Sequence, residues 1–167
     1  FVSGHVELAN KTGATIVYGP NANPSFEFKS VMDGEYLELG NVKFKVLHTP
    51  GHTMESTTYL LLDEEGKEHA IFTGDTLFIG DVGRPDLAVK TDLTQADLAG
   101  HLYDSLRNKI MTLPDDVIVY PAHGQGSACG KNMSSERSDT LGNQKKFNYA
   151  LRADMTKEEF IKELTTG

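Results

Sequence analysis

The chain has 167 residues, 38% hydrophobic and 24% charged, which suits one soluble domain with a buried core and excludes a disordered or membrane-spanning chain. Its 16 Lys and Arg against 24 Asp and Glu leave a net charge of -8, which argues against general binding to nucleic acid or to an anionic membrane. One cysteine excludes an internal disulfide, and the sequence shows no leader or apolar span, so we expect a cytoplasmic location.

The first half of the chain predicts one short helix followed by strands. Ser3 is placed to cap a helix over residues 5–11, and Gly13 closes it. A β-branched strand is expected at 15–18. Alternating apolar and charged residues predict a hairpin with arms at 35–39 and 42–48. Two more strands, at 57–62 and 70–73, flank a turn at 63–66.

The second half is mainly helical. A helix is expected from Thr94 to Leu113, and Pro114 ends it. A buried strand at 117–120 precedes a loop rich in glycine and serine. Two helices follow at about 141–151 and 156–164, the second with a capping box formed by Thr156 and Glu159. The pattern predicts an α/β or α+β class, with one domain over residues 1–167 and no second domain.

Three predicted strand ends run into loops that carry a histidine or an aspartate between small residues. His52 lies in Pro-Gly-His-Thr at 50–53, Asp75 in Thr-Gly-Asp-Thr at 73–76, and His123 in Pro-Ala-His-Gly at 121–124. Small residues let the backbone approach a metal closely, and strand ends are rigid platforms. Each segment alone is typical of a turn, but converging strand ends would gather all three side chains around a cation.

In this order and spacing, the three segments resemble the metallo-β-lactamase superfamily, over nearly the whole chain. The segment Gly-Asp-Val-Gly-Arg-Pro-Asp at 80–86 is similar to the glyoxalase II and persulfide dioxygenase branch. The segment Gly-Ser-Ala-Cys-Gly-Lys at 126–131 is similar to bacterial persulfide dioxygenases whose metallo-domain precedes rhodanese domains. The resemblance implies an α/β fold, the metallo-β-lactamase-like αβ/βα sandwich, represented here by its central and C-terminal part.

The resemblance also implies an N-terminally truncated domain. Family members carry a His-x-His-x-Asp-His loop that would lie immediately before Phe1, in a longer parent protein. In that register Phe1 stands where the loop has its last histidine, which serves the second metal in zinc thioesterases. Its replacement favours one metal and therefore the iron dioxygenase branch. Half of a two-sheet sandwich is also expected to expose an apolar sheet face.

By this resemblance, His52 and Asp75 are metal ligands for one Fe(2+) per chain, with a third histidine from the upstream loop; the ligand types alone do not separate iron from Zn(2+). His123 corresponds to a second-metal ligand of the thioesterases. In a one-metal site it would instead orient a ligand or the substrate through hydrogen bonds, which makes it a catalytic candidate.

Three residues in the later loops are further candidates. Arg84 would hold a glutathione carboxylate or pair with Asp86 to fix its loop, and Lys131 has the same two readings on weaker grounds. Cys129 is a catalytic candidate, because a nearby ammonium favours the thiolate and persulfide exchange, with an inert packed thiol as the alternative. Metal ligation by Cys129 is not expected, because the family does not use it so.

The main functional hypothesis is iron-dependent oxidation of a low-molecular-weight persulfide by O2 to sulfite and thiol. Zinc-dependent thioester hydrolysis of glyoxalase II type is the alternative, with metal-bound hydroxide as the nucleophile. A third hypothesis is an inactive fragment that lacks the His-x-His loop. The expected partners are a small-molecule thiol persulfide and O2. A rhodanese domain after Gly167 and a homo-oligomer both stay open.

Overall fold

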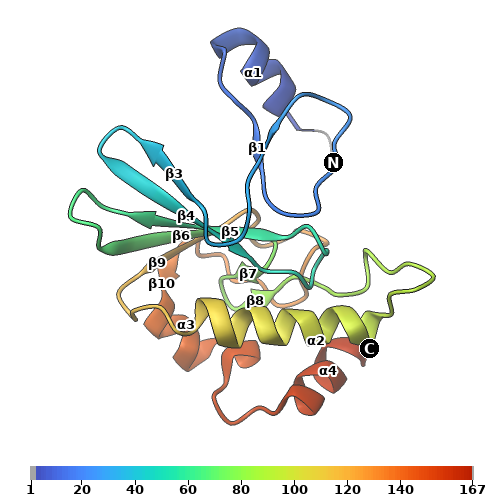
Figure 1. The fold of residues 1–167 in the computed structure, drawn as a ribbon. Coiled ribbons are helices and arrows are strands. Elements are labelled where there is room, and N and C mark those ends of the chain that lie inside the picture. Colours follow the sequence, from blue (N-terminus) through green and yellow to red (C-terminus); the bar gives the residue numbers. More distant parts are fainter. Residues whose placement is uncertain (1–2, 167) are drawn as a thin grey trace.

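A computed structural model describes residues 3–166, so the expectation for Phe1 lies outside the described residues (Figure 1). The elements follow in chain order: α1 His5–Thr12, β1 Val17–Tyr18, β2 Lys29–Ser30, β3 Tyr36–Leu39, β4 Val42–His48, β5 Thr57–Leu62, β6 Glu68–Gly74, β7 Leu77–Phe78, β8 Asp81–Val82, α2 Gln95–Ser105, η1 Leu106–Ile110, β9 Ile118–Pro121, β10 Asp139–Thr140, α3 Leu141–Phe147, η2 Tyr149–Leu151 and α4 Lys157–Thr165.

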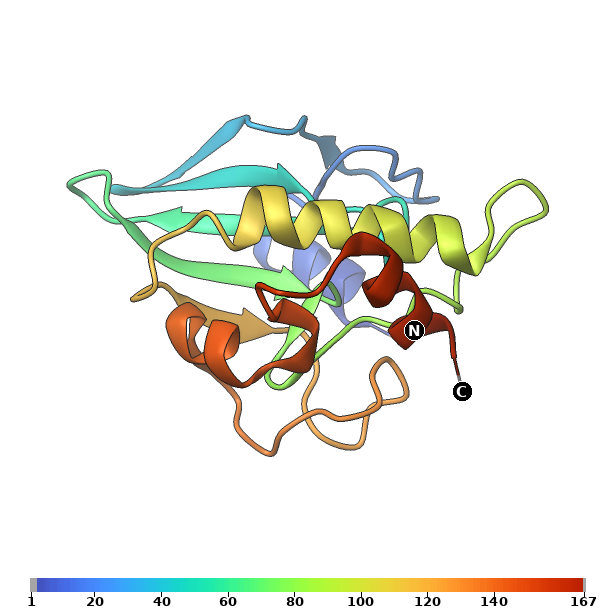
Figure 2. The ribbon, with the colours of Figure 1, turned by 90° about the horizontal axis from the view of Figure 1, so that it is seen from below.

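A six-stranded sheet with the order β10-β9-β6-β5-β4-β3 forms the centre of the molecule. Strands β3 to β6 pair antiparallel in sequence, whereas β9 lies parallel to β6 and β10 antiparallel to β9. The crossover from β6 to β9 runs through β7, β8 and α2, and Figure 2 shows α2 lying along one face of the sheet. Hairpins first and helices late confirm the predicted α/β organisation.

One face of the sheet is covered by α2, α3 and α4, which lie together on the same side (Figures 1 and 2). Leu60, Ile71 and Val119 point toward these helices and are buried in the same cluster as Leu102 and Phe160. The side chains alternate along each strand, so every second residue reaches this core. The packed face therefore fixes the register of the strands.

The opposite face of the sheet carries partly exposed aromatic rings. Phe72 of β6 stacks on Tyr120 of β9 with ring centroids 5.4 Å apart, and Phe44 of β4 approaches Phe72 at 6.0 Å. Phe72 and Tyr120 are 39% and 40% exposed, which is high for rings in the middle of a sheet. The expectation of an exposed apolar sheet face is confirmed.

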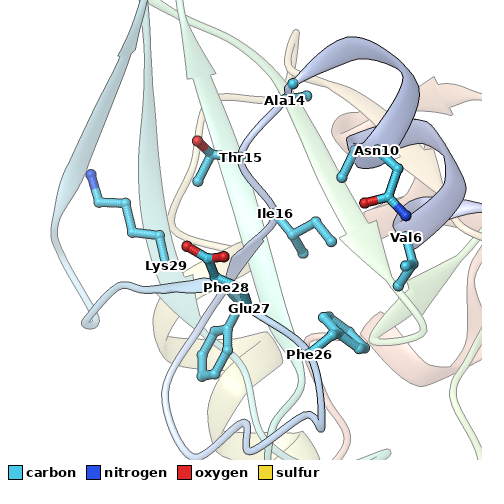
Figure 3. Close-up of a pocket in the computed structure, with 11 residues that line it drawn as sticks. Val6, Asn10, Ala14, Thr15, Ile16, Phe26, Glu27, Phe28 and Lys29 are labelled. Carbon is cyan, nitrogen blue, oxygen red and sulfur yellow. The ribbon is translucent and has the colours of Figure 1, made fainter.

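The N-terminal segment stands away from the helical layer, with α1 on the other side of the sheet (Figure 1). Helix α1 buries none of its residues, and it contributes one wall of a hollow of about 410 Å3. Figure 3 shows Ile16, Phe26 and Val6 around this hollow, opposite the strand segment that carries Lys29. This region is therefore held by fewer packed side chains than the helix-covered face.

The predicted helices differ from the observed ones in their ends. Gly4, not Ser3, is the N-cap residue of α1, and it has no side chain with which to cap the helix. The Ser3 hydroxyl contacts the His5 ring instead. The expected helix 94–113 continues from α2 into a π-helical turn that ends at Ile110. The expected helix 141–151 breaks at Asn148, whose extended backbone separates α3 from η2. Within residues 3–166, no helix combines the length and apolar character needed to cross a membrane.

Candidate metal centre

The three loops singled out in the sequence meet at one edge of the sheet. Strands β4 and β6 are both antiparallel to β5, so they run in the same direction, and β9 is parallel to β6. The C-terminal ends of these three strands therefore lie at the same edge of the sheet, β9 beside β6 and β4 one strand farther along. His52 follows β4, Asp75 follows β6 directly, and His123 follows β9. A hydrogen bond from the Ala122 amide to the Gly74 carbonyl, at 3.0 Å, ties the last two ends together.

Asp75 lies between the two histidines. Its Oδ2 is 3.3 Å from His52 Nε2, and its Oδ1 is 3.2 Å from His123 Nε2. The side chains of His52 and Asp75 are 8% and 15% exposed, whereas that of His123 is 26% exposed. The structure thus brings the three predicted residues into one cluster, with His123 at its more open side.

The backbone fixes which nitrogen of His52 faces the cluster. Its Nδ1 lies 2.7 Å from the carbonyl oxygen of Arg84, and a carbonyl only accepts, so Nδ1 carries the proton. Nε2 then directs either a second proton or a lone pair at the Asp75 carboxylate. Burial disfavours the charged ring, but the hydrogen bonds to Asp75 and to the Arg84 carbonyl raise the pKa of His52 above its ordinary value. A cation bound between Nε2 and Asp75 would replace that second proton.

The Asp75 carboxylate suits a cation in the same way. Burial opposes its ionisation, but the hydrogen bond from His52 and the charge of His123 lower its pKa below the ordinary value. Although His123 is close to Oδ1, this buried oxygen has no hydrogen-bond partner among the described residues. A buried oxygen that lacks a donor is costly unless something else satisfies it. Asp75 and His52 therefore fit a metal ion, which could bind one carboxylate oxygen and the Nε2 atom.

Cys129 lies in the same cluster, although the predicted metal ligands do not include it. One ligand atom each of His52, Asp75 and Cys129 all lie within 4.8 Å of one another. Cys129 is 6% exposed and packs with Phe78 and Met133, and its side chain helps to lower the pKa of Asp75. The loop after β9 thus turns back and places the only cysteine of the chain at the candidate metal site.

Asp81 organises this loop, a role that the sequence did not reveal. Its buried carboxylate accepts hydrogen bonds from the amides of Lys131 and Asn132, both at 2.6 Å, and from the Tyr149 hydroxyl at 2.7 Å. Burial and the neighbouring carboxylate raise the pKa of Tyr149, so the hydroxyl keeps its proton and donates it. One signal was present, because Asp81 lies in the glycine-containing segment 80–86 that carried the family resemblance.

Gly83 is a second residue whose role only the structure shows. A Cβ atom at this position would lie 1.9 Å from the backbone oxygen of Asp75 and 2.9 Å from His52 Cβ. No side chain fits in that space, so only glycine lets the loop pack against both candidate ligands. The glycine spacing of the segment 80–86 thus has a steric reason at the site.

Arg84 and Lys131, the predicted substrate-binding residues, lie beside the cluster rather than in it. The Arg84 guanidinium forms two hydrogen bonds to the Asp86 carboxylate, with Nε at 2.9 Å, and a third to the Ala128 carbonyl at 3.2 Å. Of the two readings of Arg84, the structure shows the pairing with Asp86. Arg84 and Lys131 line a separate hollow of about 20 Å3, which holds no more than about one water molecule.

A larger hollow of about 600 Å3 opens directly on the cluster. His52, Asp75 and His123 line it, together with Tyr18 and Tyr59. Its volume is in the range of small-molecule sites. A mixed nitrogen and oxygen ligand set with an open side suits Zn(2+) as a Lewis acid or Fe(2+) as a redox centre, and the ligand types do not distinguish these ions.

Comparisons with known proteins agree with this geometry. The model of the metallo-beta-lactamase superfamily matches residues 2–123. Among solved structures, the chain resembles a metallo-beta-lactamase from Staphylococcus aureus subsp. aureus COL, with a TM-score of 0.87 and 33% identity, covering 99% of this chain and 49% of that one. It also resembles ETHE1 from Myxococcus xanthus, with a TM-score of 0.76 and 32% identity, covering 99% of this chain and 63% of that one.

A curated relative of similar closeness is the hydroxyacylglutathione hydrolase GloC of Haemophilus influenzae. It is 35% identical over 103 residues, which are 62% of this chain and 43% of the relative. The chain thus spans less than half the length of this relative and about half that of the staphylococcal protein.

Proposed function

Because the chain belongs to the metallo-beta-lactamase superfamily, in the branch that includes persulfide dioxygenases and glyoxalase II, we propose that its full protein oxidises a low-molecular-weight persulfide. In the proposed reaction, dioxygen and water convert the outer sulfur to sulfite and release the parent thiol and two protons. The electrons that leave the sulfur reduce both atoms of dioxygen. Glutathione persulfide is the substrate type that we favour.

The observation that carries the proposal is the buried pair of His52 and Asp75 beside a thiol. A persulfide brings sulfur to the metal, and the Cys129 thiol lies within 4.8 Å of both ligand atoms. Likeness to ETHE1, a persulfide dioxygenase, over 99% of the chain supports the same reaction. Thioester hydrolysis, in contrast, uses a metal-bound hydroxide and gives no reason for a cysteine at this place.

Each residue has a proposed part in the reaction. His52 and Asp75 hold one Fe(2+), together with a histidine from outside the chain, and the bound iron supplies the activation of dioxygen. His123 orients the substrate or a ligand through Nε2. Cys129 accepts or retains the outer sulfur, and Lys131 and Arg84 fix the loops that border the substrate. A rhodanese domain, a homo-oligomer and a cytoplasmic location are compatible proposals.

A zinc-dependent thioester hydrolase is the second candidate, and one specific feature favours it. The two oxygens of Asp75 face two different imidazoles at 3.3 and 3.2 Å, an arrangement suited to a carboxylate that bridges two metal ions. Likeness to the hydroxyacylglutathione hydrolase GloC points to the same reaction. In that case His123 would bind the second metal directly.

Oxygen uptake by the full protein tests the proposal. The iron-loaded protein is assayed with glutathione persulfide in an oxygen electrode, and sulfite is quantified. The same preparation, loaded separately with zinc, is assayed with a glutathione thioester. We expect iron-dependent oxygen uptake with one sulfite formed per dioxygen. Thioester turnover by the zinc form, without oxygen uptake by the iron form, would replace the dioxygenase with the hydrolase.

A further inference from the structure

The position of Cys129 has a consequence for metal selectivity. We propose that the cysteine makes this centre a binding site for thiophilic divalent ions, of the zinc and cadmium class, through His52 Nε2, an Asp75 oxygen and Cys129 Sγ. Such an ion would compete with the iron of the proposed function. The inference concerns ion binding itself, so it holds or fails separately from the reaction.

The separation of the His52 and Asp75 ligand atoms matches a tetrahedral ion. Bonds of about 2.0–2.1 Å to nitrogen and oxygen separate neighbouring ligand atoms by about 3.3–3.4 Å in a tetrahedron. His52 Nε2 and Asp75 Oδ2 are 3.3 Å apart in the structure. Zinc forms a longer bond to sulfur, of about 2.3 Å. Cys129 Sγ lies within 4.8 Å of the other two ligand atoms, so a small movement of its side chain brings it into bonding range.

Charge also favours the ion. When the thiol binds, its proton leaves to solvent, and the S–H bond is replaced by a sulfur–metal bond. One thiolate and one carboxylate then neutralise a divalent cation, which lowers the cost of burying it. Both side chains are buried from solvent, since His52 and Cys129 are 6% exposed each. Sulfur is a soft ligand, so the gain is largest for soft ions and small for iron.

The loop that carries Cys129 is already held in place for this role. The Arg84 backbone joins the two ligands, because its carbonyl accepts from His52 Nδ1 and its amide donates to the Cys129 carbonyl at 2.9 Å. The Ser127 hydroxyl accepts from the Cys129 amide at 3.2 Å, and the Asp81 carboxylate accepts from the amides of Lys131 and Asn132. Hydrogen bonds to the residues that bind a metal orient their side chains before the metal arrives.

The test is a titration of the full protein, prepared without metal, with Co(2+) and with Cd(2+). In the wild-type protein we expect a sulfur-to-cobalt charge-transfer band that saturates at one ion per chain. Cys129→Ser keeps the size of the side chain, and we expect it to lose the band and to bind Cd(2+) roughly 100-fold more weakly. His101→Ala, which removes an exposed imidazole elsewhere, is the matched control and should leave both unchanged.

Two outcomes would overturn the inference: a wild-type protein without the band, or a Cys129→Ser protein with the band and the wild-type affinity. Iron content and oxygen uptake are measured on the wild-type and Cys129→Ser proteins as well, so that the test of ion binding is separate from the test of the proposed reaction. If Cys129→Ser still loads iron but no longer binds Cd(2+) tightly, the thiophilic site stands whatever the reaction is. Circular dichroism of both variants excludes loss of folding as the cause.

Discussion

The two halves of the candidate metal centre differ in how firmly the fold holds them. His52 is buried against Gly83 and donates a hydrogen bond to the Arg84 carbonyl, and the Asp75 side chain beside it is only 15% exposed. His123 lies on the open side, 26% exposed, where its ring approaches Phe78 at 6.1 Å. The side chains of His52 and Asp75 are already in position before a metal binds, which suits metal ligands. His123 has room to move, which suits contact with the substrate. The following predictions test this division.

The largest effect is expected from the buried pair itself. Asp75→Ala removes the carboxylate that lies between the two imidazoles and leaves the proposed iron with only two of its three anchors, His52 and the upstream histidine. Metal content per chain, measured after dialysis against metal-free buffer, should fall below about a tenth of the wild-type value, and His52→Ala should behave alike. Retention of one tightly bound metal in both variants would contradict the assignment of these ligands.

Gly83→Ala should be the most damaging change that leaves every ligand in place. The new methyl group would overlap the Asp75 backbone oxygen, so the loop must move, at a cost of about 3 kcal/mol in the free energy of unfolding. Denaturant unfolding measures the cost, and the metal affinity should fall with it.

Gly124→Ala is the matched control on the open side, because a Cβ atom there meets nothing within 4 Å. Its stability should stay within about 0.5 kcal/mol of the wild type. Equal losses in the two glycine variants would mean that the buried half is no more tightly packed than the open half.

Asp81→Asn tests whether the hydrogen bonds that the Asp81 carboxylate accepts hold the loop of Cys129 in place. The amide cannot accept from the Lys131 and Asn132 amides, from Val82 and from Tyr149 as the carboxylate does, so we expect a loss of about 2–3 kcal/mol in stability. Asp115→Asn, in an exposed pair with Lys145, is the control and should cost less than about 1 kcal/mol. A loss of the same size in both variants would remove the anchoring role of Asp81.

The smallest effect is expected on the open side. His123→Ala should leave the metal bound while turnover of the iron-loaded protein falls about 10- to 100-fold, the range for a group that acts through a ligand or the substrate. Metal content and turnover are measured on the same sample. Loss of the metal together with activity would make His123 a direct ligand and favour the two-metal hydrolase.

The parts of this molecule that the sequence predicts are those whose structure depends on residues close together in the chain. Strand β5 was predicted with its observed bounds, and the Thr156 capping box formed as expected, because alternation and capping depend on neighbouring residues. The meeting of His52, Asp75 and His123 was also predictable, since small residues at three strand ends mark a common edge. Strands β7, β8 and β10 were missed because two residues show no period.

Long-range contacts account for what the sequence left out. The break at Asn148 arises because its side chain donates to the Phe78 and Asp81 carbonyls, some 70 residues away, rather than staying in a helix. The buried carboxylate of Asp81 and the missing side chain of Gly83 matter only through partners on other loops. The place of Cys129 among the ligand atoms depends on the same contacts.

The most direct test of the metal assignment is anomalous diffraction from crystals of the full protein, at the absorption edges of iron and zinc. We predict one iron peak within bonding distance of His52 Nε2 and the Asp75 carboxylate, with His123 Nε2 beyond bonding distance. Two peaks bridged by Asp75, the second bound by His123, would contradict the one-metal account and establish the binuclear alternative.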